Sequence, residues 1–168
     1  MDKDIAIAMA NLTTGIYVLT VNDGTHHHGM SSSWVIPVSG EPPLFMAAID
    51  NRHFSRAIVS NREVFGLNIV GRRGKELEDY FYSAKSRQPD NLEGLDYELS
   101  PKLKVPWLGL AMISIEARVT ASHIAGDHTM FIAEMAGVRI GATDEPLSSL
   151  DLHYVYVGGT ELLKRVRE

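Results

Sequence analysis

The sequence predicts a mainly β protein, with a few short helices and one antiparallel sheet that closes into a barrel. Six or seven segments have the apolar or alternating character of strands, and most of them are joined by short turns. No strand–helix–strand alternation runs along the chain, and no Gly-x-Gly-x-x-Gly motif occurs. A parallel, dinucleotide-binding Rossmann fold is therefore not expected.

Composition limits the class of protein further. The 168 residues, 45% of them hydrophobic, suit a single domain spanning 1–168. The net charge of −5 argues against nucleic acid or an anionic membrane as a partner. The absence of cysteine excludes disulfides and thiolate metal sites. With no apolar run near the length of a membrane span and no signal-peptide pattern at the N-terminus, we expect a cytoplasmic protein.

A short helix is expected first, over residues 4–11. Ile5, Ala8 and Met9 fall on one face of such a helix, and an aspartate can cap its start.

A hairpin and a buried strand follow. Residues 15–21 and about 28–38 are expected as strands on either side of Asn-Asp-Gly at 22–24, which is a hairpin turn signal. Ser-Gly-Glu-Pro-Pro at 39–43 then breaks the chain. The next strand, over 44–49, is apolar on both faces.

The middle of the chain contains the clearest helix. One or two helical turns over 54–61 and a strand over 63–70 precede an amphipathic helix over 74–86. Leu77 and Phe81 are among the apolar residues that recur there at helical spacing.

Residues 87–109 are polar and broken by prolines, so a long loop with little regular structure is expected. The remaining elements are two long strands over 110–124 and 128–140 with a turn at 125–127 between them, a short strand over 153–159, and a small tail over 160–168.

Three consecutive histidines, His26, His27 and His28, raise the question of a metal site. Neighbouring residues on a strand point to opposite faces, so three in a row cannot converge on one ion without distortion. The triplet also directly follows the Asn-Asp-Gly turn. A solvated hairpin end is therefore expected, and no metal ligand is assigned.

Three consecutive serines, Ser31, Ser32 and Ser33, lie within the second expected strand. They lack the Gly-x-Ser-x-Gly context of a nucleophile. A strand with one solvated face explains them without any function. The functional alternative is a platform on which a flat ligand lies close to the backbone, with hydroxyls that add hydrogen bonds without bulk.

A polar turn, Asp50 to Arg56, joins the buried strand to the next helix. Arg52, His53 and Arg56 offer donors or positive charge, and Ser55 adds a hydroxyl near the helix start. This pattern is typical of a site for an anion such as phosphate, although it also fits an ordinary capped connection.

A second turn, Ala125 to Thr129, places His128 next to Asp127 at the start of a strand. Taken alone it reads as a simple β-turn, because Gly-Asp is common in turns.

These segments, taken together and in this order, resemble the flavin reductase-like, FMN-binding split-barrel family. The resemblance covers about residues 12–138 and depends most on "HGMSSSWVIPVSGEPPL" and "GDHTMFIAE". It implies a six-stranded antiparallel split β-barrel that forms a homodimer, with FMN as the cofactor.

The resemblance also implies roles for individual residues. Those expected along the flavin ring are Ser31, Ser32, Ser33 and Trp34, and those expected at its phosphate are Asp50, Asn51, Arg52, His53 and Ser55. Gly126, Asp127 and His128 would lie where a nicotinamide stacks, with His128 as the candidate catalytic residue that orients it. Family members often carry Ser-Ser-Arg-Thr in the phosphate turn, where this chain has Arg52-His53-Phe54-Ser55, and a smaller residue at Trp34.

The predicted function is therefore an NAD(P)H-dependent flavin reductase, an oxidoreductase that passes hydride from NAD(P)H to flavin. Flavin and a nicotinamide nucleotide are its expected partners, together with a possible redox partner protein. Two alternatives stay open: a flavoredoxin-like protein that receives electrons from another protein, and a split-barrel module that holds flavin or heme without turnover.

Overall fold

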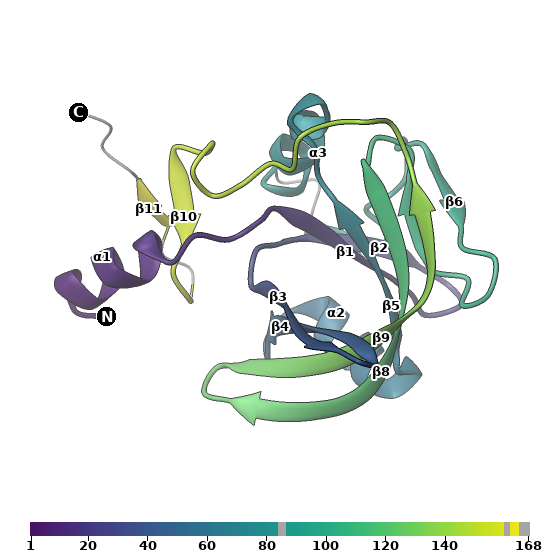
Figure 1. Ribbon diagram of the computed structural model, residues 1–168, viewed down its shortest axis with the longest axis horizontal. Coiled ribbons are helices and arrows are strands. Elements are labelled where there is room, and N and C mark those ends of the chain that lie inside the picture. Colours follow the sequence, from purple (N-terminus) through teal and green to yellow (C-terminus); the bar gives the residue numbers. More distant parts are fainter. Residues whose placement is uncertain (84–86, 160–161, 165–168) are drawn as a thin grey trace.

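The computed structural model describes residues 1–83, 87–159 and 162–164, and these residues form a mainly β molecule (Figure 1). Among the described residues the helices are α1 (Lys3–Asn11), α2 (Phe54–Arg62), α3 (Lys75–Phe81) and the 3-10 turn η1 (Arg72–Gly74). The strands are β1 (Tyr17–Asn22), β2 (His27–Ser32), β3 (Val35–Gly40), β4 (Pro43–Asp50), β5 (Val64–Ile69), β6 (Tyr97–Leu99), β7 (Pro106–Leu108), β8 (Ile113–Ala125), β9 (His128–Ile140), β10 (Tyr154–Tyr156) and β11 (Leu162–Lys164).

The main sheet is antiparallel, with strand order β2-β1-β5-β8-β9-β4-β3. Its two edge strands, β2 and β3, follow one another in the chain with only Ser33 and Trp34 between them. The sheet must therefore curl until these edges meet at one corner, although they do not pair along their length. This open, curled sheet confirms the prediction of a mainly β, split-barrel architecture.

The expected single strand over 28–38 is thus wrong in one respect. It divides at Ser33 and Trp34 into β2 and β3, so the main sheet has seven strands instead of the six that the resemblance implied. The division is required by the topology, because the chain passes here from one edge of the sheet to the other. The backbone of Trp34 remains bonded to β4, because its carbonyl oxygen accepts a hydrogen bond of 2.9 Å from the backbone N–H of Ala48.

The side chains on the two faces of β1 pack in two separate apolar clusters. Leu19 and Val21 point into the barrel interior, where they pack with Phe45, Phe65 and Phe131, among others. Val18 lies on the opposite face, as the two-residue repeat of a strand requires, and Ile16 just before the strand lies with it. They pack on the outer side of the barrel with α3 and its neighbours: Val70, Leu77, Phe81, Leu92, Leu108, Ala111, Leu147 and Leu152.

The segment expected as an irregular loop, 87–109, contains the paired strands β6 and β7. Buried side chains of the main sheet hold it in place. The Asn68 Oδ1 accepts a hydrogen bond of 2.9 Å from the Leu108 N–H, and the Thr20 hydroxyl donates to the Pro106 carbonyl over 2.6 Å. These partners lie about 40 and 86 residues away in sequence, so a local pattern could not predict the strands.

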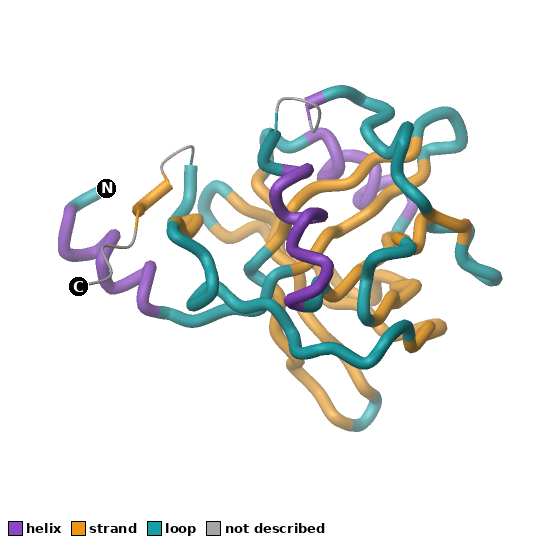
Figure 2. The backbone as a smooth tube through the Cα atoms, turned by 90° about the horizontal axis from the view of Figure 1, so that it is seen from above, coloured by secondary structure: helices purple, strands orange, loops and turns teal. Residues whose placement is uncertain are grey.

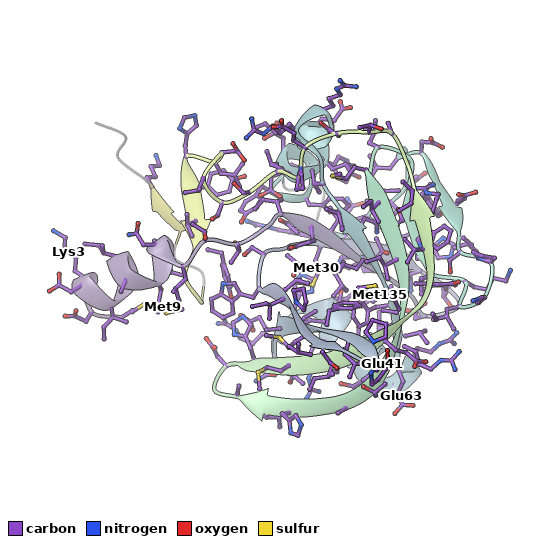
Figure 3. All side chains as sticks on the ribbon, viewed as in Figure 1. Lys3, Met9, Met30, Glu41, Glu63 and Met135 are labelled. Carbon is purple, nitrogen blue, oxygen red and sulfur yellow. The ribbon has the colours of Figure 1, made fainter. Side chains whose placement is uncertain are left out.

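The N-terminal helix packs away from the barrel, against the C-terminal hairpin of β10 and β11 (Figures 1 and 2). Ala10 of α1 is buried against Val155 and Val157, and Met9 packs beside them. In Figure 3, Met9 lies on this outlying unit, whereas Met30 lies near the centre of the molecule. The expected helix over 4–11 is confirmed, but its buried residues are Ala6 and Ala10, whereas Ile5 of the expected apolar face is 55% exposed. The expected tail contains β11 within its described part.

The amphipathic helix is shorter than expected. α3 ends at Phe81 with Tyr82 as its C-cap, while residues 84–86 of the predicted 74–86 span lie outside the described residues. None of the helices in the described ranges is long and apolar enough to cross a membrane.

Candidate functional site

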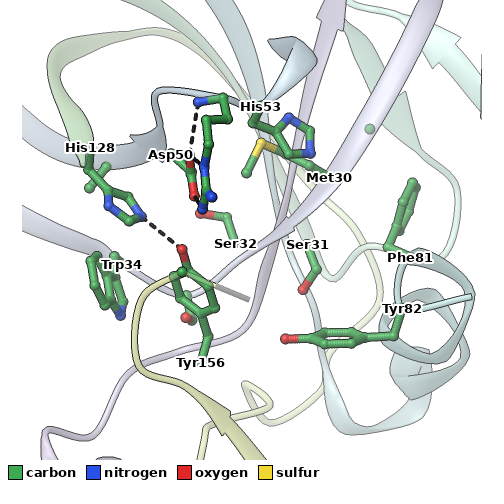
Figure 4. Close-up of a pocket in the computed structure, with 15 residues that line it drawn as sticks. Met30, Ser31, Ser32, Trp34, Asp50, His53, Phe81, Tyr82, His128 and Tyr156 are labelled. Atoms are coloured by element: carbon green, nitrogen blue, oxygen red, sulfur yellow. Dashed lines mark hydrogen bonds and ion pairs between the residues drawn. The ribbon is translucent and has the colours of Figure 1, made fainter. Parts of the chain in front are cut away.

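A pocket of about 470 Å³ lies where the end of β2, the end of β4 and the start of β9 meet, and α3 and the C-terminal hairpin complete it (Figure 4). This volume is within the usual range for small-molecule sites, about 300–1,000 Å³. The lining residues are Gly29, Met30, Ser31, Ser32, Ser33, Trp34, Ala48, Asp50, Arg52, His53, Phe81, Tyr82, His128, Tyr156 and Gly159.

The structure brings together most of the site residues expected from the sequence. Those that line the pocket are Ser31, Ser32, Ser33, Trp34, Asp50, Arg52, His53 and His128. Asn51 and Ser55 do not line it. Asn51 instead holds the β8–β9 turn, because its N–H donates to the Asp127 carbonyl (2.9 Å) and its Oδ1 accepts from the Thr129 hydroxyl (2.6 Å).

One side of the pocket is formed by Ser31, Ser32 and Ser33, and we call it the serine wall. Ser31 lies on the side of Tyr82, as Figure 4 shows, and its hydroxyl is 2.7 Å from Glu78 Oε2. Neighbouring residues of a strand face opposite ways, so Ser32 points away from Glu78.

A second part of the lining comes from the polar turn, residues 50–55, through Asp50, Arg52 and His53. Here Asp50 and Arg52 form a two-pronged ion pair, with Nε to Oδ1 at 3.1 Å and Nη2 to Oδ2 at 2.8 Å. Asp50 Oδ1 also accepts from the Arg52 backbone N–H at 2.8 Å. Hydrogen bonds from Arg52 lower the pKa of Asp50 to about 2. The Arg52 side chain remains 66% exposed, so the guanidinium is both paired and accessible.

His53, in the same turn, is the N-cap of α2. Its Nδ1 accepts a hydrogen bond of 3.2 Å from the Ser55 N–H and so caps α2. Acceptance at Nδ1 assigns the ring proton to Nε2. Burial, followed by electrostatic repulsion from His28, lowers the pKa of His53 to about 4. His53 is therefore a neutral donor near pH 7, not a cation.

Two polar atoms next to this turn are buried without a partner among the described residues. They are the Ser55 Oγ and the His28 Nε2. Buried polar groups nearly always have hydrogen-bond partners, so such atoms mark places where a ligand or water belongs. Both belong to residues that contact or neighbour His53: the His28 and His53 rings lie 5.7 Å apart, and Ser55 is two residues further along the chain.

The expectation of a solvated histidine triplet is wrong for His28, which is only 2% exposed. Its Nδ1 lies 3.0 and 3.1 Å from the carbonyl oxygens of Gln88 and Pro89, in the segment that covers β2. Burial lowers the pKa of His28. His26 and His27 make separate contacts, with Asp23 and Tyr97 respectively. The three rings therefore do not share a site.

An aromatic cluster closes a third side of the pocket. The Trp34 ring lies 4.6 Å from the His128 ring and 5.2 Å from the Tyr156 ring. His128 Nδ1 is 2.7 Å from Asp127 Oδ1, and its Nε2 is 3.1 Å from the Tyr156 hydroxyl (Figure 4). Burial, followed by the charges of Asp50 and Asp127, raises the pKa of Tyr156 to about 12. Tyr156 therefore keeps its proton near pH 7 and can donate it to His128 Nε2 in the tautomer whose Nδ1–H donates to Asp127.

Sequence reasoning missed the aromatic residues that other elements bring to the pocket, namely Phe81, Tyr82 and Tyr156. Phe81 had a signal, since it lies on the apolar face of the predicted helix. Its ring packs so closely on Gly29 that a Cβ there would lie 2.7 Å from it. Tyr156 had none, because only the docking of the C-terminal hairpin places it beside His128.

Comparison with known proteins gives a consistent result. A family model described as "Flavin reductase like domain" matches residues 9–158. The chain is 27% identical to an NADPH-flavin oxidoreductase of Streptomyces viridifaciens, over 92% of this chain and 81% of that protein. It is 24% identical to a high molecular weight rubredoxin of Moorella thermoacetica, over 91% of this chain and 67% of that one. Among solved structures, a flavin reductase domain protein of Arthrobacter sp. FB24 matches with a TM-score of 0.79 at 20% identity, covering 100% of this chain and 98% of that chain.

Proposed function

The chain belongs to the flavin reductase-like domain family, and on this basis we propose that it is an NAD(P)H-dependent flavin reductase that binds FMN. The observation that carries the proposal is the convergence, around one pocket, of a serine wall, a polar turn with an accessible arginine, and a histidine held by two partners.

The chemistry of the pocket suits FMN. A flat ring needs a surface without bulky side chains, and three consecutive serines provide one. A phosphate needs donors, and the polar turn offers the Arg52 guanidinium and the His53 Nε2–H. The start of α2 follows this turn, and the helix dipole there also favours an anion, although the Ser55 hydroxyl itself is buried and does not line the pocket.

FMN, when bound, supplies the redox chemistry, because its ring accepts hydride from a nicotinamide and passes electrons on. The protein holds and orients the reactants. We assign the serine wall to the ring and the polar turn to the phosphate. His128, fixed between Asp127 and Tyr156, presents a ring of defined orientation beside Trp34 and orients the nicotinamide.

The test is the absorption spectrum of the purified protein loaded with FMN, followed by anaerobic addition of NADH and, separately, NADPH. The proposal predicts a yellow protein that bleaches with at least one of them. Titrations with FMN, FAD and riboflavin define the preferred flavin. A protein that binds none of the three contradicts the proposal.

A second candidate is an electron-transfer flavoprotein that takes electrons from a protein partner. The observation in its favour is the similarity to a protein named as a rubredoxin over nearly the whole of this chain. A yellow protein that neither nicotinamide bleaches, but that a reduced redox protein does, would favour this candidate. A colourless protein, or a red one that binds heme, would favour a non-catalytic module.

We also propose a homodimer. Large apolar side chains are exposed on the long strands β8 and β9, with Ile124 at 73%, Ile140 at 72% and Val138 at 47% exposure. A second copy would cover such side chains. Light scattering should give about twice the chain mass of 18.6 kDa, and the mass of a single chain at micromolar concentration would contradict the dimer.

A further inference from the structure

A buried carboxylate lies directly behind the serine wall. Glu78, on α3, is 1% exposed. Its Oε2 is 2.7 Å from the Ser31 hydroxyl, and its Oε1 is 3.2 Å from the Tyr154 hydroxyl. Among the described residues, no cationic side chain forms an ion pair with it. A carboxylate that is buried without a cation is costly, so its presence here calls for an explanation.

The groups that face Glu78 come from three elements. On α3 these are Lys75 and Asp79, which pair with each other at 2.7 Å on the exposed side of the helix, and Tyr82 at its end. On β10 it is Tyr154, and on β2 it is Ser31. Burial raises the pKa of Glu78, while the hydrogen bonds from Ser31 and Tyr154 act against that rise.

The Ser31 hydroxyl carries a single proton, and Glu78 determines where that proton points. When Glu78 is ionised it can only accept, so Ser31 donates to it and presents only lone pairs to the pocket. When Glu78 is neutral it can donate to Ser31, which frees the Ser31 proton for the pocket. Since Ser31 lines the pocket, the state of Glu78 changes the serine wall from acceptor to donor.

We propose that Glu78 is a positioning residue that acts through Ser31 and sets the relative affinity of the pocket for oxidised and reduced FMN. The inference rests on the proposed function, since it takes FMN as the occupant. Reduced flavin is richer in electrons than oxidised flavin, so a wall that donates and carries no charge favours it. A wall that accepts, backed by a buried negative charge, favours the oxidised form.

The test compares the dissociation constants of oxidised FMN and of dithionite-reduced FMN, measured anaerobically by fluorescence titration. Glu78→Gln holds this side chain neutral at every pH and keeps an amide that donates to Ser31. We expect it to raise the affinity for reduced FMN relative to oxidised FMN by about tenfold. This equals a rise of about 30 mV in the two-electron midpoint potential of the bound flavin. Glu76→Gln, an exposed carboxylate on the same helix, is the matched control and should leave the ratio unchanged.

A double-mutant cycle tests the route through Ser31. In a Ser31→Ala background only the direct effect of the Glu78 charge remains, so Glu78→Gln should change the ratio of the two dissociation constants by clearly less than tenfold. A full effect in that background would overturn the role of Ser31, and an unchanged ratio in the single Glu78→Gln variant would overturn the inference as a whole.

A milder variant covers the case in which Glu78→Gln does not fold. Tyr154→Phe removes one hydrogen bond to Glu78 and so raises its pKa further. It should raise the affinity for reduced FMN relative to oxidised FMN by two- to threefold. No change in this ratio would contradict the inference. Failure of the wild-type protein to bind FMN would contradict the proposed function instead, so the two failures are distinguishable.

Discussion

The serine wall and the polar turn both line the pocket, but their polar groups are held in opposite ways. Ser31 is bonded to a carboxylate 47 residues away that is almost fully buried. Arg52 is bonded to Asp50, two residues away, and two thirds of its side chain is exposed. The wall is therefore fixed by tertiary packing, whereas the turn is a local unit whose charges can rearrange. We expect the wall to decide whether any flavin binds, and the turn to distinguish flavins that carry a phosphate.

The largest expected effect comes from crowding the wall. Ser32→Leu places a bulky side chain on the platform, and overpacking of this kind typically costs about 1–3 kcal/mol. FMN and riboflavin should both lose affinity, by up to about a hundredfold, as measured by quenching of flavin fluorescence. Ser32→Ala, the matched control, should keep the yellow colour. If Ser32→Leu retains full affinity for both ligands, the wall is ordinary strand surface.

Removing the donors of the turn should have a smaller and more selective effect. Arg52→Ala combined with His53→Ala should weaken FMN binding about tenfold, because the exposed, paired arginine contributes less than a buried charge–phosphate bond. Riboflavin has no phosphate and should bind nearly as before. Arg62→Ala, at the far end of α2, serves as the control. Equal losses for both ligands would remove the turn from the phosphate site.

A third substitution separates binding from turnover. His128→Ala should leave the affinity for FMN intact and slow reduction by the nicotinamide severalfold, since His128 is assigned to orient that substrate. Tyr156→Phe, which removes one of the two hydrogen bonds to His128, should slow it less. Stopped-flow bleaching of the flavin measures both rates. A loss of FMN affinity equal to the loss of rate would place His128 on the flavin instead.

The last effect is on the pH dependence of stability and involves no ligand. The pKa of His53 is about 4 in the folded protein, against an ordinary value of 6.5. Between these pH values the unfolded chain binds more protons, so stability falls as the pH drops from about 6.5 to 4. The loss is at most about 3.5 kcal/mol, because the two pKa values differ by about 2.5 and one pKa unit equals about 1.4 kcal/mol. Urea unfolding at pH 7 and pH 4.5 measures it.

His53→Asn should reduce this pH dependence, because asparagine can still cap α2 but does not titrate there. His123→Asn, which changes an exposed histidine on β8, should leave it unchanged. An identical fall in stability in wild type and His53→Asn would show that His53 is not held neutral in the fold.

Local signals were sufficient for most of the fold. The Asn-Asp-Gly turn, the alternation in the last long strands and the capped first helix all correspond to observed elements. The division of the expected 28–38 strand could not be predicted from neighbouring residues. Ser33 and Trp34 lie outside the sheet because the chain passes there from one edge strand to the other. The pairing of β6 with β7 depends on Asn68 and Thr20, whose partners are distant in sequence.

The site residues also fall into two groups, those that the sequence indicates directly and those that only the tertiary structure brings to the site. Ser31, Asp50 and Arg52 lie in short runs of unusual composition, which the sequence displays directly. Tyr156 and Glu78 reach the pocket or its wall only through the docking of the C-terminal hairpin and of α3. The pairing of Arg52 with Asp50 was also not predictable from residue type, because it depends on the geometry of the turn.

A crystal structure of the protein with FMN tests most directly the assignment of the two sides of the pocket. We predict that the flavin ring lies along Ser31–Ser33, and that the phosphate lies within hydrogen-bond distance of Arg52 or His53. In that complex Arg52 should turn at least one nitrogen from Asp50 toward the phosphate. A flavin bound with its phosphate at Trp34 and His128, or outside this pocket altogether, would contradict the assignment.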